Sequence, residues 1–164
     1  MQTSSNSAGL RPVFPTPLSL PLRLVPSYVH NKALVTALNK LFTQDLDEGE
    51  LDFLIDRVVC ITIEDAGIEY QFTMKNGELI PADKNRSPDL LLNGTVYDYL
   101  LLASRREDTD TLFFRRQLRM EGDTELGLYV KNFLDGLDME SHKIPGYLES
   151  VLKKSLPLYE RLFG

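Results

Sequence analysis

The chain has 164 residues, enough for one domain but too few for two of ordinary size. Its net charge of −6 lacks the basic excess that a nucleic-acid-binding protein needs, while 43% hydrophobic residues suffice for a buried core. No stretch reaches the roughly 18 uninterrupted apolar residues of a membrane span, and no signal peptide opens the chain. We therefore expect a cytoplasmic protein.

Charge is distributed unevenly along the chain. Residues 1–40 hold four basic residues and no acidic one, so the remainder is strongly acidic. Five prolines interrupt the apolar stretch 10–29, which therefore cannot be one helix. We expect residues 1–29 to form a flexible arm that rests on a membrane, a partner or its own domain. The membrane-contact candidates are Arg11, Phe14, Leu22 and Arg23.

The first half of the domain changes from a helical to a strand pattern. Apolar residues at helical spacing predict a helix over 31–46 that ends near Gly49. Alternating residues then predict strands over 59–63 and 68–74, joined by a turn at Gly67. Asn76-Gly77 is a strong hairpin signal and leads into a third strand. The predicted third and fourth strands cover residues 78–81 and 89–93.

The second half begins with a capping signal. Thr95, with Asp98 three residues later, resembles a capping box that opens a short helix. A helical turn over 110–116 and a fifth strand near 118–121 follow. Asp123 then caps a strong amphipathic helix up to about residue 137. The last expected element is an amphipathic helix within 141–164, bent or broken at Pro157.

These elements predict an α+β fold in which a five-stranded, antiparallel-rich sheet carries helices on one face. We divide the chain into the arm 1–29, a central domain 30–140 and the C-terminal helix 141–164.

Few residues offer catalytic chemistry. Cys60 lies inside a predicted strand and is interpreted as buried and inert. His30 and His142 stand at helix ends with no second ligand at helical spacing, so no metal site and no cofactor is expected. The acidic run 45–50 lacks the register of a calcium loop. The arginine pairs 105–106 and 115–116 are either solvated helix ends or a basic spot for an anionic headgroup.

The segment 88–138 carries a family resemblance. PDLLLNGTVYDYLLLAS followed by DTDTLFFRRQLRMEGDTELGLYVKNFLDGLD resembles the sterol-carrier-protein-2 lipid-binding domain. The run from Asp110 to Asn132 is more specific. It is similar to the bacterial branch of that family whose members are accessory factors in ubiquinone biosynthesis, the oxygen-independent route in particular.

This resemblance implies a non-catalytic, lipid-binding accessory protein whose sheet and helices enclose an apolar tunnel. The implied ligand is a prenylated quinone precursor, which the protein would present to separate hydroxylases, with peripheral contact to the inner membrane. A tunnel for such a ligand needs flexible and aromatic walls. The tunnel candidates are Phe72, Met74, Leu92, Tyr97, Leu101, Phe113, Phe114, Leu118, Met120, Tyr129, Phe133 and Leu134.

Three alternatives remain open from the residues alone. The protein could be a general phospholipid or fatty-acid carrier. It could be a structural adaptor in a biosynthetic complex with a filled core and no ligand of its own. It could also be an enzyme that uses the same cavity, which predicts a polar residue of shifted pKa beside the tunnel; no candidate stands out in the sequence.

Overall fold

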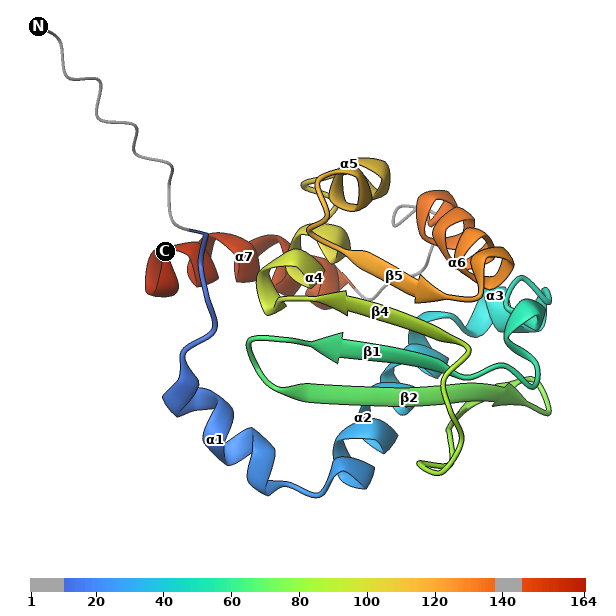
Figure 1. Cartoon of the computed structure of the whole chain (residues 1–164). Helices are drawn as coiled ribbons and strands as arrows, with labels where there is room; N and C mark the ends of the chain where they lie inside the picture. The colour runs from blue at the N-terminus through green and yellow to red at the C-terminus, as the bar shows by residue number, and fades with distance from the viewer. Residues whose placement is uncertain (1–10, 138–145) are drawn as a thin grey trace, which may run out of the picture.

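The computed structural model describes residues 11–137 and 146–164. Its elements are the helices α1 (Thr16–Leu24), α2 (Ser27–Leu41), α3 (Thr43–Asp47), the 3₁₀ turn η1 (Asp52–Leu54), β1 (Val59–Ile63), β2 (Ile68–Lys75), β3 (Glu78–Pro81), β4 (Leu90–Gly94), α4 (Val96–Ala103), α5 (Thr109–Phe114), β5 (Arg119–Gly122), α6 (Thr124–Gly136) and α7 (Gly146–Phe163). Figure 1 shows them around one central sheet.

The sheet has the strand order β3-β2-β1-β4-β5. All neighbours are antiparallel except β1 and β4, which run parallel. A loop connects β3 to β4. Asp89, at the end of this loop, holds it against the start of β1. The Asp89 carboxylate accepts a hydrogen bond from the Val58 backbone N–H over 2.8 Å. The expected α+β fold with a five-stranded, antiparallel-rich sheet is confirmed.

One face of the sheet carries the main core. The register pairs Val59 with Phe72, Met74 with Leu79 and Leu92 with Met120, so these side chains point to the same side. Helices α2 and α6 pack on this face: α2 lies against β2 and β3, and α6 against β5 and η1 (Figure 1). The apolar face of the sheet is thus the face that α2 and α6 cover.

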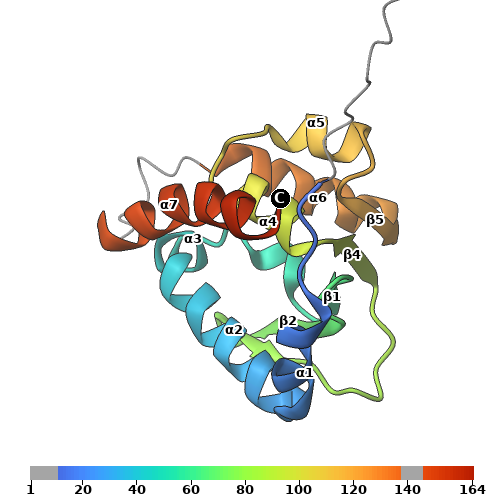
Figure 2. The ribbon, with the colours of Figure 1, turned by 90° about the vertical axis from the view of Figure 1, so that its left-hand side faces the viewer.

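A second core lies beside the sheet, between α4, α5 and α7. Its buried members are Leu101, Leu112, Leu118 and Leu156. Figure 2 shows α7 alongside α4, and the two helices are in contact. Helix α7 continues through Pro157, where we expected a bend or break. The sequence pattern could not show that α7 would complete this second core.

Local signals in the sequence set several element boundaries. Asn76 and Gly77 both have positive φ, 53° and 77°, as the hairpin turn between β2 and β3 requires. Thr95 and Asp98 form the expected capping box of α4. Asp123 caps α6 by accepting a hydrogen bond from the Leu126 N–H over 3.0 Å.

The proline-rich stretch contains α1 and the start of α2. Pro17 lies in the first turn of α1, where its missing N–H costs nothing, and Pro26 caps α2. Helix α2 begins at Ser27, so the boundary expected at residue 30 falls inside a helix. The prolines divide the stretch into two helices and do not prevent helix formation.

Candidate lipid-binding site

The main core holds a partly open cavity of about 160 Å³. Its walls come from β1, β2, β3 and β4 on one side and from α2, η1, α4 and α6 on the other. They are apolar or aromatic throughout: Leu38, Phe42, Leu51, Phe53, Leu54, Val59, Ile61, Phe72, Leu79, Leu92, Tyr99, Leu102, Val130, Phe133 and Leu134. A cavity near 150 Å³ in another protein admits a benzene molecule, so this one has room for a ring or a short piece of chain.

Tyr99 is the wall residue with a polar tip. Its hydroxyl lies 2.9 Å from the Leu92 carbonyl oxygen and 3.2 Å from that of Thr62, so it donates to the backbone of the sheet. Burial raises the pKa of the Tyr99 phenol well above its ordinary value, and the nearby Asp98 and Glu64 carboxylates raise it further. The hydroxyl therefore stays protonated, and Tyr99 contributes its apolar ring to the cavity wall.

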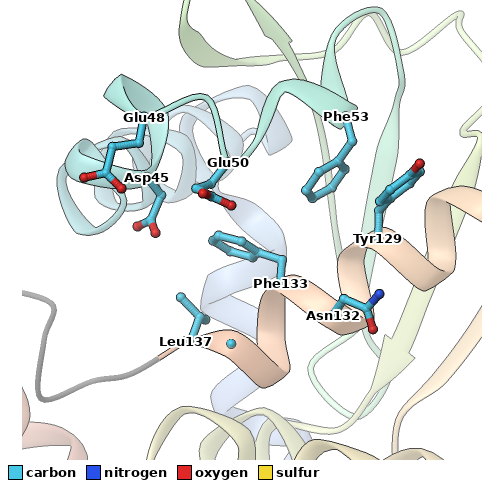
Figure 3. Close-up of a pocket in the computed structure, with 9 residues that line it drawn as sticks. Asp45, Glu48, Glu50, Phe53, Tyr129, Asn132, Phe133 and Leu137 are labelled. Carbon is cyan, nitrogen blue, oxygen red and sulfur yellow. The ribbon is translucent and has the colours of Figure 1, made fainter.

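An open groove of about 440 Å³ lies outside the cavity, between α3 and η1 on one side and α6 on the other. Phe53 and Phe133 line both spaces, so these two rings form the partition between groove and cavity. Figure 3 shows them with Tyr129 on one side of the groove and the carboxylates of Asp45, Glu48 and Glu50 on the other. An amphiphile could therefore place its two ends in two different environments.

This arrangement, an antiparallel-rich sheet with an apolar cavity under its helices, matches a known family. The SCP-2 sterol transfer family profile aligns with residues 37–135. The chain belongs to this family. The family assignment made from segment 88–138 is confirmed.

Proteins similar in sequence or in structure give closer comparisons. The ubiquinone biosynthesis accessory factor UbiT of Escherichia coli K12 is 40% identical over 126 residues, covering 77% of this chain and 72% of that protein. The protein of the same name from E. coli O157:H7 aligns with the same identity and coverage. The solved structure of the ubiquinone synthesis protein UbiJ-SCP2 has a TM-score of 0.53 at 12% identity, covering 65% of this chain and 94% of that one, and shares the fold.

Five of the twelve tunnel candidates line the cavity or the groove in the structure. Phe72, Leu92, Phe133 and Leu134 line the cavity, and Tyr129 lines the groove together with Phe133. Phe72 and Leu92 lie on the helix-covered face of the sheet, and the other three lie on α6.

The other seven candidates lie elsewhere. Met74 and Met120 belong to the main core away from the cavity wall, whereas Tyr97, Leu101, Phe113 and Leu118 belong to the second core. Phe114 is 91% exposed, so it is not a wall of the cavity. In the short helix α5, Leu112 takes the fully buried position instead.

Eleven residues that line the cavity were not among the tunnel candidates. Val59 and Ile61 could have been found, because they alternate on the strand that pairs with Phe72. Leu38 and Phe42 share the helical spacing of α2. Nothing in the sequence marked Phe53, since η1 has no periodic pattern. The remaining members are Leu51, Leu54, Leu79, Tyr99, Leu102 and Val130.

The four membrane-contact candidates lie in the N-terminal segment and its contacts with later parts of the chain. Arg11 pairs with Asp98, and its guanidinium lies 5.9 Å from the centre of the Tyr97 ring. Phe14 packs near the Phe163 ring. The backbone carbonyl of Leu22 lies 2.6 Å from His30 Nε2. The Arg23 side chain lies over Gly67, beside the Ala66 carbonyl.

Cys60 and the arginine pair 105–106 have structural surroundings in the described residues. Cys60 is fully buried, and burial raises the pKa of its thiol. Arg105 donates to the Leu134 carbonyl over 3.1 Å and Arg106 to Glu160 over 3.2 Å, so this pair connects helices. His142 lies outside the described residues.

Two searches of the described ranges complete the inventory. No helix in residues 11–137 or 146–164 has both the length and the apolar character that a bilayer crossing demands. In the same ranges, no three His, Cys, Asp or Glu side chains gather as a metal site would require.

Proposed function

We propose that this protein is a non-catalytic accessory factor of ubiquinone biosynthesis that binds prenylated quinone precursors. The observation that carries the proposal is the apolar cavity inside an SCP-2 fold, in a chain 40% identical to a ubiquinone biosynthesis accessory factor. A prenyl chain is the ligand part that such walls suit, because they offer contact to apolar atoms and no free polar group within the described lining.

The size of the cavity limits how much ligand it holds. A volume near 160 Å³ takes a short part of a polyprenyl chain, and the rest must lie in the groove, along the surface or in a membrane. Burying on the order of 150 Å² of chain supplies roughly 4 kcal/mol before ordering costs. That suits a protein that must release its ligand to an enzyme more than one that stores it.

Presentation of the precursor to separate hydroxylases, and use in the oxygen-independent route, are part of this proposal. Both come from the resemblance of segment 110–132 to the accessory-factor branch and from the 40% identity. A partly enclosed ligand supports presentation, because the portion outside the cavity stays accessible to another protein. A general phospholipid or fatty-acid carrier is the main rival function.

The direct test is the lipid content of the full-length protein. We expect an organic extract of protein purified without detergent to contain prenylated quinones or their precursors, identified by mass spectrometry. An extract with phospholipid or fatty acid alone would favour the general carrier. An empty extract, with no binding of added prenyl lipid, would favour the adaptor and contradict the proposal.

We also infer peripheral membrane contact through α1 and the start of α2. Helix α1 buries a polar residue and exposes apolar ones. Ser19 is fully buried, whereas Leu18, Leu20 and Leu24 are exposed. The neighbouring Val25, Tyr28 and Val29 are exposed as well. Since residues 11–40 contain no acidic side chain, an anionic lipid surface would meet apolar and basic groups together.

The double variant Leu20→Ser/Leu24→Ser tests this contact. We expect it to lower co-sedimentation with vesicles of phosphatidylglycerol and phosphatidylethanolamine by about tenfold or more, since two exposed leucines no longer insert. Leu128→Ser on α6, where the leucine is about as exposed as Leu20, is the control and should leave binding unchanged. Equal binding by wild type and the double variant would show that α1 does not touch the bilayer.

A further inference from the structure

An open pocket of about 380 Å³ lies at the elbow between α1 and α2. Residues 22–27, His30 and residues 67–69 line this space, which we call the elbow pocket. Figure 1 shows the elbow at the end of the sheet where β1 turns into β2. The exposed Leu24 and Val25 belong both to its lining and to the apolar surface around α1. A lipid that meets this surface therefore meets the elbow pocket as well.

Opposite charges line the elbow pocket without pairing to each other. Arg23 comes from the last turn of α1, and Glu69 comes from the start of β2. Within residues 11–137 and 146–164, neither side chain makes an ion pair. The Glu69 carboxylate accepts a weak hydrogen bond from the Cys60 thiol over 3.7 Å. One cation and one anion are thus available to a ligand that carries the complementary pair of charges.

The turn between β1 and β2 holds the Arg23 guanidinium in place. Its Nε donates a hydrogen bond to the Ala66 carbonyl over 3.4 Å, and the guanidinium lies against the backbone of Gly67. A Cβ at position 67 would clash with the guanidinium, and the φ of +66° there also favours glycine. The two Nη groups of Arg23 are left to donate to a ligand. Because this fork is already positioned, it loses little freedom when it binds an oxyanion.

A second cation lies at the rim of the elbow pocket. Ser27, the first residue of α2, accepts a hydrogen bond from Lys84 Nζ in the loop before β4. A phosphate in the pocket would meet Arg23, with Lys84 at the rim. Glu69 would repel a second negative charge and attract an ammonium group. The charges of the elbow pocket therefore match a phosphate that is joined to a primary ammonium.

We propose that the elbow pocket binds the headgroup of phosphatidylethanolamine when α1 lies on a membrane. Arg23 binds the phosphate, Glu69 accepts hydrogen bonds from the ammonium, and Leu24 and Val25 contact the acyl chains. This inference rests on the membrane contact proposed above and adds a lipid class to it. The selected headgroup is zwitterionic with an ammonium that donates hydrogen bonds, in contrast to choline and glycerol headgroups.

Vesicles that differ only in the ammonium group isolate the role of Glu69. One set contains phosphatidylglycerol with dioleoyl phosphatidylethanolamine. In the other set dioleoyl phosphatidylcholine, whose trimethylated ammonium donates no hydrogen bond, replaces the ethanolamine lipid. We expect the full chain to co-sediment with the first set at roughly fivefold higher affinity, because a charge-assisted hydrogen bond is lost with the second. In Glu69→Gln the two affinities should become equal.

Glu78→Gln is the matched control for Glu69→Gln. It removes an exposed carboxylate on β3, outside the lining of the elbow pocket, and should keep the wild-type preference. The looser packing of ethanolamine lipids acts on both variants alike, so a difference between them reports the carboxylate. Circular dichroism checks that each variant is folded.

Arg23→Gln tests the contact to the phosphate. Because both phospholipid sets carry phosphates, this variant should bind both more weakly. Lys32→Gln removes an exposed basic residue of α2 outside the pocket lining and controls for the loss of one positive charge. We expect the loss of affinity in Arg23→Gln to exceed that in Lys32→Gln by about threefold or more, since general attraction to an anionic surface is similar for the two residues.

The outcomes separate the headgroup site from the membrane contact. Equal binding of the two vesicle sets by wild type, or a preference that Glu69→Gln retains, would overturn the headgroup site while the contact of α1 stands. Equal losses in Arg23→Gln and Lys32→Gln would overturn the assignment of Arg23 to the phosphate. Failure of wild type to bind either set would overturn the membrane contact and the headgroup site together.

Discussion

Replacing Val130 with phenylalanine is expected to remove prenyl lipid from the purified protein while leaving it folded. Val130 is a partly buried wall residue on α6, and the cavity beside it is close in volume to one that admits benzene. The new ring would fill the space that the chain uses. Since it enters a void, the free energy of unfolding should change by less than about 1.5 kcal/mol.

Mass spectrometry of the organic extract and calorimetry with 2-geranylphenol measure the effect, with at least a tenfold loss of affinity expected. Val13→Phe is the matched control, because Val13 is exposed before α1 and lies outside the cavity lining. It should keep the lipid content of wild type. Normal lipid content in Val130→Phe, with a native urea transition, would mean that the chain binds somewhere other than this cavity.

The largest loss of stability is expected from Asp98→Ala. Asp98 is 2% exposed, caps α4 and pairs with Arg11 from the N-terminal segment. Its carboxylate also accepts hydrogen bonds from the Thr95 N–H at 2.9 Å and the Thr95 hydroxyl at 2.7 Å. Losing the cap and the ion pair together should lower the free energy of unfolding by about 2–3 kcal/mol.

Urea denaturation of the variants separates the two contributions. Asp98→Asn keeps a hydrogen-bonding side chain but no charge, so it should lose less stability than Asp98→Ala. Arg11→Ala should cost about 1 kcal/mol, because half of the Arg11 side chain is exposed and the Thr95 contacts remain. Asp110→Ala, at a largely exposed carboxylate of α5, is the control and should stay within about 0.5 kcal/mol of wild type. A wild-type midpoint for Asp98→Ala would contradict this account of the N-terminal attachment.

Elements whose signals are local could be predicted from the sequence. The five strands, the Asn76-Gly77 turn, and the caps at Thr95 and Asp123 each depend on residues a few positions apart. From β1 onward the order of strands and helices was therefore correct, and it supported the family assignment, whereas α1 was not predicted. The start of α2 was less accurate, since the helix begins at Ser27 directly after Pro26. Pro21 and Pro157 both lie inside helices, where the sequence suggested interruptions.

Local periodicity by itself predicted the strands and most helices of this chain and hence its fold class, and the residues of segment 88–138 carried the family resemblance. Only the tertiary structure decided which buried residues surround empty space. The walls at Val59, Phe72, Leu92 and Val130 meet because β1 pairs with both β2 and β4 and α6 returns over the sheet. Likewise, α1 turns its leucines outward because Arg11 and Arg23 attach it by partners far along the chain. Such contacts join segments whose separation in sequence carries no periodic signal, so side-chain type alone cannot distinguish a cavity wall from ordinary core.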